Sequence, residues 1–126
     1  MDDIQDPELF RDLCESATDL IQSVTPDGRF AYVNRAWLDA LGYSRDDVAR
    51  LSVWDVIHPD SREHCEREMR KVMAGHNAIR LSAVFRTKDG ESIHVQGSAA
   101  CRFADGNPVA TCGIFRNVSD VSRAEE

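Results

Sequence analysis

Cysteine and histidine have the widest chemistry of the residue types in this chain, and their spacing limits what they can do. The four cysteines, Cys14, Cys65, Cys101 and Cys112, lie far apart, and no two form a C-x-x-C pair. Structural zinc sites normally draw on such pairs, so the spacing argues against a metal site. No nucleophile stands in the strand, sharp turn and helix motif of a hydrolase. The sequence therefore predicts a domain without an active site, whose thiols are reduced and mostly buried.

Two histidines need separate consideration because histidine can act as a base or as an axial ligand of haem. His94 falls on the face of a predicted strand opposite to the apolar face, toward the N-terminal helix or solvent. His64 lies in a predicted helix, about 100° around the axis from Cys65 and off the stripe that Cys65 forms with Met69 and Val72. We therefore interpret His64 as a surface residue and Met69 as a core residue.

Composition narrows the functional classes further. The chain has 126 residues, 42% hydrophobic and 29% charged, as expected for one globular domain. A net charge of −7 argues against duplex nucleic acid and anionic membranes as partners. No apolar run approaches the length of a membrane helix, and the N-terminus is acidic rather than signal-like. We expect a cytoplasmic protein.

A polar leader at residues 1–6 precedes a predicted helix from Pro7 to Ala17, for which Asp6 is the expected cap. One side of this helix is an apolar stripe consisting of Leu9, Phe10, Leu13, Cys14 and Ala17. Two interpretations remain open: the stripe packs on the domain's own sheet, or part of it packs against a second subunit. In the second case Leu9, Phe10 and Leu13 are the candidate dimer contacts.

Local signals then define a strand, a turn, a second strand and a helix. Residues 19–25 and 29–33 are the predicted strands, joined by a tight turn at Asp27-Gly28. Asn34 is the expected N-cap of a short helix with Trp37, Leu38 and Leu41 on one face, and Gly42 closes it.

Three further helical segments follow in the middle of the chain. Ser44 to Asp47 is a capping-box arrangement, and Val53 to Ile57 is a short turn that contains Trp54. The longest helix is predicted at about residues 61–74, with Asp60 as its cap and Gly75 at its end.

The second half of the chain is predicted to be three strands, at 79–88, 93–103 and 109–116, with turns at Asp89-Gly90 and Asp105-Gly106. The second turn places Cys101 opposite Thr111, with Cys112 on the other face, so these cysteines are not expected to form a disulfide. Strands at both ends and helices in the middle predict an α+β fold with an antiparallel sheet covered on one side.

Four motifs of this sequence resemble those of PAS domains, the sensory-box modules of signalling proteins. They are the run from Asp27 through Asn34 to Leu41-Gly-Tyr-Ser, His58-Pro-Asp-Ser-Arg, Lys88-Asp-Gly, and the stretch 113–126 that ends in Arg-Ala-Glu-Glu. The resemblance implies a five-stranded sheet of order 2-1-5-4-3, with the middle helices on one face and the N-terminal helix on the other. It divides the chain into a leader and flanking helix at 1–17, a sensory domain at 18–117 and the start of a signalling linker at 118–126.

The end of the domain departs from the family pattern. Where the family has Asp-Ile-Thr, this chain has Asn117-Val118-Ser119, preceded by Arg116. We take these four residues as the signalling exit. Asn117 lacks the carboxylate of an ion pair but can make neutral hydrogen bonds.

The resemblance also implies a sheet that curves over the middle helices, with a ligand pocket between them. Glycines in the strands would leave room there, and the alternative is that bulky neighbours fill the space. The candidate pocket residues are Trp54, Ile57, Met69, Val72, Leu81, Phe85, Val95, Gly97, Thr111, Gly113 and Phe115. Cys101-Arg-Phe is similar to part of the Asn-Cys-Arg-Phe motif of flavin-binding relatives, but it follows an alanine on a strand. We therefore expect neither flavin nor haem.

By resemblance, the chain is a non-enzymatic sensory or relay domain of a larger protein, with a sensor histidine kinase or a diguanylate cyclase as the effector. It would form a homodimer and sense a small apolar or mixed ligand. The alternative is a ligand-free dimerisation or protein-interaction module attached to a diguanylate cyclase or a transcriptional regulator.

Overall fold

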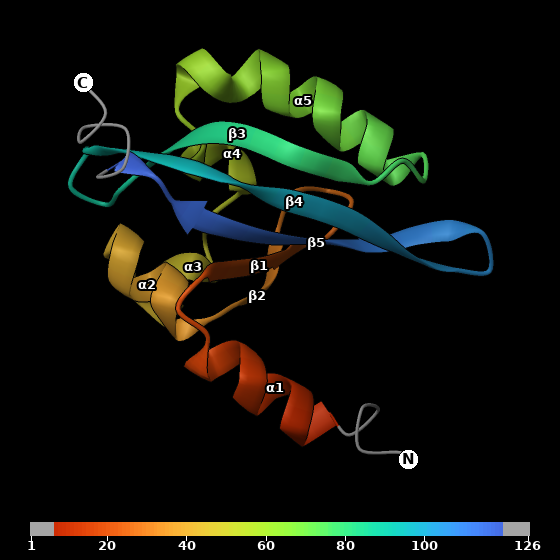
Figure 1. Cartoon of the computed structure of the whole chain (residues 1–126), viewed down its shortest axis with the longest axis horizontal. Helices are drawn as coiled ribbons and strands as arrows, with labels where there is room; N and C mark the ends of the chain where they lie inside the picture. Colours follow the sequence, from red (N-terminus) through yellow and green to blue (C-terminus); the bar gives the residue numbers. More distant parts are fainter. Residues whose placement is uncertain (1–6, 120–126) are drawn as a thin grey trace.

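The computed structural model describes residues 7–119, which form a five-stranded antiparallel sheet and helices around it (Figure 1). The predicted strand order, β2-β1-β5-β4-β3, is confirmed. The leader at 1–6, with Asp6, and most of the linker at 118–126 lie outside the described residues. In chain order the elements are α1 Pro7–Ser16, β1 Leu20–Val24, β2 Phe30–Val33, α2 Arg35–Leu41, α3 Arg45–Val48, α4 Val53–Val56, α5 Pro59–Met73, β3 Ala78–Arg86, β4 Ser92–Ala104 and β5 Asn107–Asn117.

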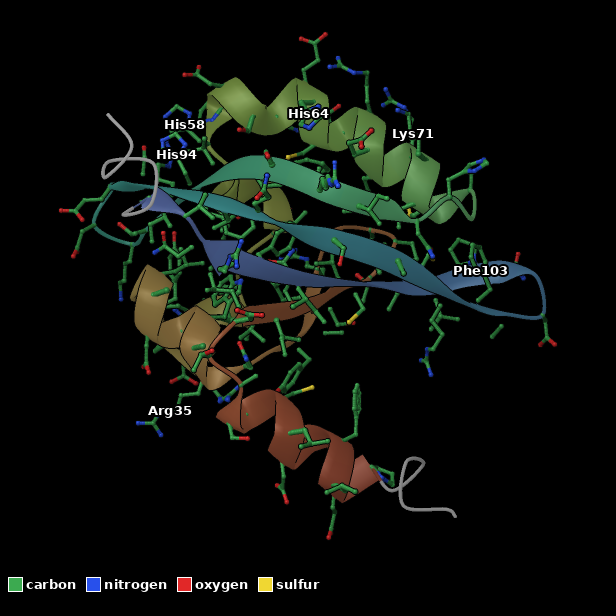
Figure 2. The ribbon with its side chains drawn as sticks, in the orientation of Figure 1. Arg35, His58, His64, Lys71, His94 and Phe103 are labelled. Carbon is green, nitrogen blue, oxygen red and sulfur yellow. The ribbon has the colours of Figure 1, made fainter. Side chains whose placement is uncertain are left out.

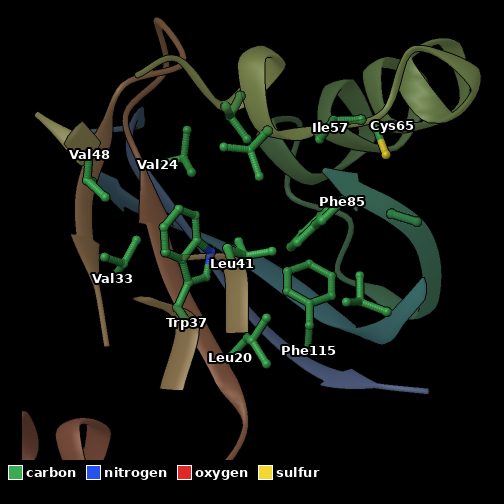
Figure 3. Packing of buried hydrophobic residues seen from close by; sticks show 14 residues of the cluster. Leu20, Val24, Val33, Trp37, Leu41, Val48, Ile57, Cys65, Phe85 and Phe115 are labelled. Carbon is green, nitrogen blue, oxygen red and sulfur yellow. The ribbon is translucent and has the colours of Figure 1, made fainter. Parts of the chain in front are cut away.

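The core lies between the inner face of the sheet and helices α2–α5 (Figure 3). Trp37 and Leu41 of α2 are fully buried against β1, and the ring of Trp37 meets Phe30 edge-on at 5.2 Å. On the other side of the core, Phe85 of β3 and Phe115 of β5 pack at 5.3 Å with their rings inclined by 68°. These contacts bury large apolar side chains, the main source of folding free energy.

Most of the predicted helix ends are confirmed. The Asn34 side chain accepts from the Trp37 N–H, and Gly42 ends α2 with φ 81°. The capping box of Ser44 and Asp47 is present at α3. A second capping box, between Ser52 and Asp55, begins α4 and was not predicted.

The start of α5 was predicted wrongly. The helix begins at Pro59, not at residue 61, and its cap is His58, whose Nδ1 accepts from the Asp60 N–H at 3.1 Å. Proline suits the first helical position because its ring presets φ and it has no N–H to leave unpaired. The extended conformation of His58 (ψ 140°) is the one that a following proline imposes.

An irregularity in β2 separates its two aromatic side chains. Val24 pairs with Phe30 and Ser23 pairs with Tyr32, so Ala31 is an extra residue between them. The bulge turns Phe30 toward the core and Tyr32 toward the outer face of the sheet, whereas regular alternation would place both on one face. Figure 1 shows α1 beyond β2 and β1, at the edge of the sheet opposite to α5.

Candidate functional site

Most of the predicted pocket residues are packed in the core. Trp54, Leu81 and Met69 are partly buried. The others with side chains are buried, namely Ile57, Val72, Phe85, Val95, Thr111 and Phe115. The rings of Phe85 and Phe115 contact one another and fill the middle of this region.

The two strand glycines of the predicted pocket are covered by the chain's own atoms. A Cβ at Gly113 would lie 2.7 Å from Cε2 of the Phe115 ring. A Cβ at Gly97 would overlap the Ile114 carbonyl and lie 2.8 Å from Cα of Phe115. Glycine at these positions therefore permits the close approach of β5 and of the Phe115 ring.

A hollow of about 240 Å³ opens beside the predicted pocket, between the β1–β2 turn, α4 and α5. Trp54 and Met69 line it together with Met73. The guanidinium of Arg62 lies 5.3 Å above the Trp54 ring, a cation–π distance. This hollow brings together only two of the predicted pocket residues, and its walls combine apolar side chains with the ion pair of Arg62 and Glu66.

A cluster of charged and polar side chains joins α1 to the domain. The Glu15 carboxylate, in the last turn of α1, accepts from the Tyr32 hydroxyl and from Nη2 of Arg45 at 3.1 Å. Arg45 also donates from Nη1 to the Val33 carbonyl at 3.1 Å. Burial and the neighbouring Glu15 carboxylate raise the pKa of Tyr32, so its hydroxyl remains a donor at neutral pH. We call Glu15, Tyr32 and Arg45 the α1 anchor.

Asn34 supplies a second attachment for α1. Its Nδ2 donates to the carbonyls of Cys14 at 2.8 Å and Asp19 at 2.9 Å, while its Oδ1 accepts from the N–H groups of Ile21 and Trp37. One fully buried amide therefore joins α1, β1 and α2. Sequence reasoning found the cap but not these other contacts, nor the α1 anchor, because both depend on residues far apart in the chain.

The predicted exit is held by one local hydrogen bond and by two hydrogen bonds to His94 of β4. The Asn117 Oδ1 accepts from the Ser119 N–H at 3.0 Å. Val118 N–H donates to the His94 carbonyl and His94 N–H donates to the Ser119 hydroxyl, each at 2.8 Å. Arg116, the fourth residue of the exit, is exposed on the outer face of β5. Asn117 thus makes a neutral hydrogen bond where the family's aspartate would stand.

The two ends of the domain meet in the sheet. Leu20, the first residue of β1 after α1, pairs with Phe115 near the end of β5. The segment from α1 and the segment toward the exit therefore run on neighbouring strands at the same end of the sheet. A displacement of β1 at Leu20 would act directly on the backbone two residues before Asn117.

The remaining candidates for chemistry lie on the surface. His64 is exposed on α5 and His94 is exposed on β4 (Figure 2). Within residues 7–119, no cluster of three or more histidine, cysteine or acidic side chains could hold a metal ion. No helix in this part of the chain is long and apolar enough to cross a membrane.

Comparisons with known proteins agree with the fold. An uncharacterized protein of Sinorhizobium fredii is 25% identical over 118 residues, which cover 93% of this chain. Single-minded homolog 1-A of Danio rerio is 26% identical over 109 residues, or 86% of the chain. The chain spans 14% of the length of each of these relatives.

Two solved structures have the same architecture. A PAS domain from Colwellia psychrerythraea superposes with a TM-score of 0.80 at 18% identity, over 90% of this chain and 97% of that one. A domain of a sensory box sensor histidine kinase/response regulator from Geobacter sulfurreducens gives 0.71 at 27% identity, over 87% and 92%. The family described as PAS domain matches residues 19–120. The chain therefore belongs to the PAS domain family of sensory modules and resembles the members found in histidine kinases.

Proposed function

We propose that this chain is a non-enzymatic relay domain of a longer cytoplasmic signalling protein, which transmits changes in the position of α1 to the exit at residues 116–119. The observation that supports this proposal is the pairing of Leu20 with Phe115, which puts the two ends of the domain on neighbouring strands. Three similar structures are domains of histidine kinases, so we favour a sensor histidine kinase as the effector over a diguanylate cyclase or a transcriptional regulator.

The contacts of α1 suit it to the input side of a relay. It has no buried residue, and it is attached at its last turn by the α1 anchor and by Asn34. Asn34 donates to Cys14 of α1 and accepts from Ile21 of β1, so movement of α1 strains β1 through one side chain. β1 then acts on β5 through five successive residue pairs, from Leu20–Phe115 to Val24–Thr111.

Hydrogen exchange in a variant with a weakened α1 anchor tests this coupling. Glu15→Gln removes the charge that Tyr32 and Arg45 contact, and we expect faster exchange in α1 and also at the Val118 and Ser119 amides. Glu63→Gln, which loses a comparable ion pair with Arg67 on the exposed side of α5, is the control. Faster exchange in α1 with unchanged exchange at Val118 and Ser119 would exclude the relay.

A second candidate function is reception of a small molecule, and the hollow beside Trp54 favours it. Native mass spectrometry of freshly purified protein separates the two functions, because a receptor would carry a bound molecule. We expect the mass of the chain alone and no visible absorption band. A Soret or flavin band near full occupancy would overturn the expectation that neither haem nor flavin binds.

A further inference from the structure

Two cysteines line one hollow on the outer side of the domain, and neither has a part in the proposed relay. The hollow lies between α1 and the outer face of β1 and β5 and has a volume of about 430 Å³. Cys14 borders it from the last turn of α1, and Cys112 borders it from β5. Both are free thiols; Cys14 is half-buried and Cys112 is exposed. The charged and titratable neighbours on the walls are Arg11, Tyr32 and Arg102.

A short series of contacts fixes how these thiols are placed. Asn34 binds the Cys14 carbonyl at 2.8 Å and the Ile21 N–H at 3.0 Å, so the backbones of α1 and β1 lie one side chain apart at this point. Ile21 pairs with Ile114, and the next outward residue of β1, Ser23, pairs with Cys112. Ile21 and Cys112 are therefore diagonal neighbours on the outer face, and such neighbours are about 7 Å apart. Cys14 is therefore held against the part of the sheet that presents Cys112.

The other two cysteines differ in position. Cys101 is only half-buried, but it is not among the residues that line the hollow, although its partner in the sheet, Thr111, is. Cys65 is buried in the core beneath α5. The pKa of the Cys112 thiol is raised, first by partial desolvation and second by the nearby Cys14.

We propose that Cys14 and Cys112 are an oxidisable thiol pair, which a hydroperoxide converts into a disulfide that fastens α1 to the outer face of the sheet. This site does not depend on the proposed relay, since it concerns only whether the two sulfurs can be joined. It would nevertheless control the element that the relay requires to move.

The reaction balances with one equivalent of hydrogen peroxide. The exposed Cys112 thiolate attacks one peroxide oxygen, the O–O bond breaks, and the departing hydroxide takes up the thiol's proton to leave as water. The Cys14 sulfur then attacks the sulfenic sulfur of Cys112, so that an S–S bond forms and the S–O bond breaks. The second oxygen leaves as water with the Cys14 proton. Both sulfurs are oxidised, and both peroxide oxygens are reduced.

The hollow gives α1 room to approach the sheet. A disulfide requires Cα atoms within about 7 Å, and movement of α1 into the hollow would bring Cys14 toward Cys112. The attachment of α1 permits this movement, because α1 has no buried residue and is joined to the domain through the α1 anchor and Asn34. Because nearby protein atoms partly desolvate both thiols and raise their pKa, little thiolate is present at neutral pH, and the oxidation is expected to be slow.

Peptide mapping of the oxidised monomer tests the proposal. The protein is treated with hydrogen peroxide, its remaining thiols are blocked, and the monomer from a non-reducing gel is digested with trypsin. Cleavage after Arg11 and Arg102 places Cys14, Cys101 and Cys112 in three separate peptides. We expect a cross-link between the Cys14 and Cys112 peptides in the wild type and in Cys101→Ser, and its loss in Cys14→Ser and in Cys112→Ser. Circular dichroism establishes that each variant is folded.

The cross-link should also change the dynamics of α1. Hydrogen exchange in α1 is expected to be slower in the oxidised wild type and to return to the reduced rate after dithiothreitol. In Cys112→Ser, peroxide should leave this exchange unchanged. The proposal is overturned if Cys112 reaches the sulfinic acid without a cross-link. It is equally overturned if the disulfide is found only between two molecules, or if Cys101 pairs as readily as Cys112.

Discussion

Asn34 holds together three elements with one side chain, which makes it the most sensitive polar residue of the domain. Asn34→Ala leaves the Ile21 and Trp37 N–H groups and two carbonyls without this partner. Each unpaired buried group costs about 1–3 kcal/mol, so we expect unfolding to become easier by roughly 3 kcal/mol or more. Urea unfolding measures the loss. Asn117→Ala is the matched control, since this exposed asparagine makes one short-range bond, and it should change stability by less than about 0.5 kcal/mol. Equal effects of both changes would show that Asn34 is only a helix cap.

Asp47 gives a prediction for the acid range. Its carboxylate accepts from the Lys88 ammonium at 2.8 Å and from the Ser44 N–H at 3.0 Å, and these bonds lower its pKa to about 2. The folded pKa lies below the unfolded value of about 3.9, so the stability that Asp47 contributes is complete above pH 4 and is lost as the pH falls toward 2. Lys88→Met should raise the Asp47 pKa in a carboxyl NMR titration. Lys71→Met, which removes an exposed lysine paired with Glu68, should not. An unchanged Asp47 pKa in Lys88→Met would show that the ammonium does not reach it.

Residues could be identified from the sequence where their signal is local. Asn34, Gly42 and the Ser44–Asp47 box each act within four residues, and all three are confirmed. The α1 anchor joins positions 15, 32 and 45, and its geometry depends on the bulge at Ala31 that turns Tyr32 outward. A bulge of one residue leaves no mark in so short a strand. This part of the candidate site could therefore not be predicted.

At the scale of elements, the end of α2 can be tested by a single substitution. Gly42 adopts φ 81°, and a Cβ there would meet only Lys88 Cβ at an ordinary 3.9 Å, so any cost of a side chain arises from the backbone. We expect Gly42→Val to lower the free energy of unfolding by roughly 1–3 kcal/mol. Gly42→Asn should cost clearly less, because asparagine tolerates the left-handed region. If urea unfolding shows the two variants to be alike, the strain is not set by φ.

The strands were the best predicted elements, since the Asp-Gly turns indicated their places and a period of two indicated the faces of β3, β4 and β5, whereas the bulge in β2 broke that period. The start of α5 was missed because aspartate is a common helix cap and histidine is not, so Asp60 was preferred to His58. The sequence left open whether the predicted pocket is a cavity or is filled by bulky neighbours, and it could not decide between the two. Gly113 shows room along the strand but not that the Phe115 ring folds back over it.

At the scale of the whole molecule, the order of the sheet came from the family resemblance, because the pairing of β1 with β5 joins residues more than 85 apart that carry no local signal. The same pairing explains why one small sheet can link the two ends of the domain. It also leaves α1 on the outer side, with an apolar surface that the described part of the chain does not cover. Leu9, Phe10 and Leu13 remain 41%, 52% and 63% exposed.

We predict that this surface forms a weak homodimer, in which α1 and the outer face of the sheet of each subunit meet their equivalents across a two-fold axis. Exposed apolar side chains gathered on one helix face favour such a contact, because burial in a partner removes them from water. Sedimentation of the wild type should show a monomer–dimer equilibrium at high micromolar concentration. Phe10→Glu with Leu13→Glu should abolish the dimer, since it would bury four charges. His64→Glu with Arg67→Glu, on the exposed side of α5, adds the same side chains elsewhere and should leave the dimer intact, with circular dichroism to establish the fold. A monomeric wild type, or a dimer that survives the α1 double variant, would mean that α1 serves only its own subunit.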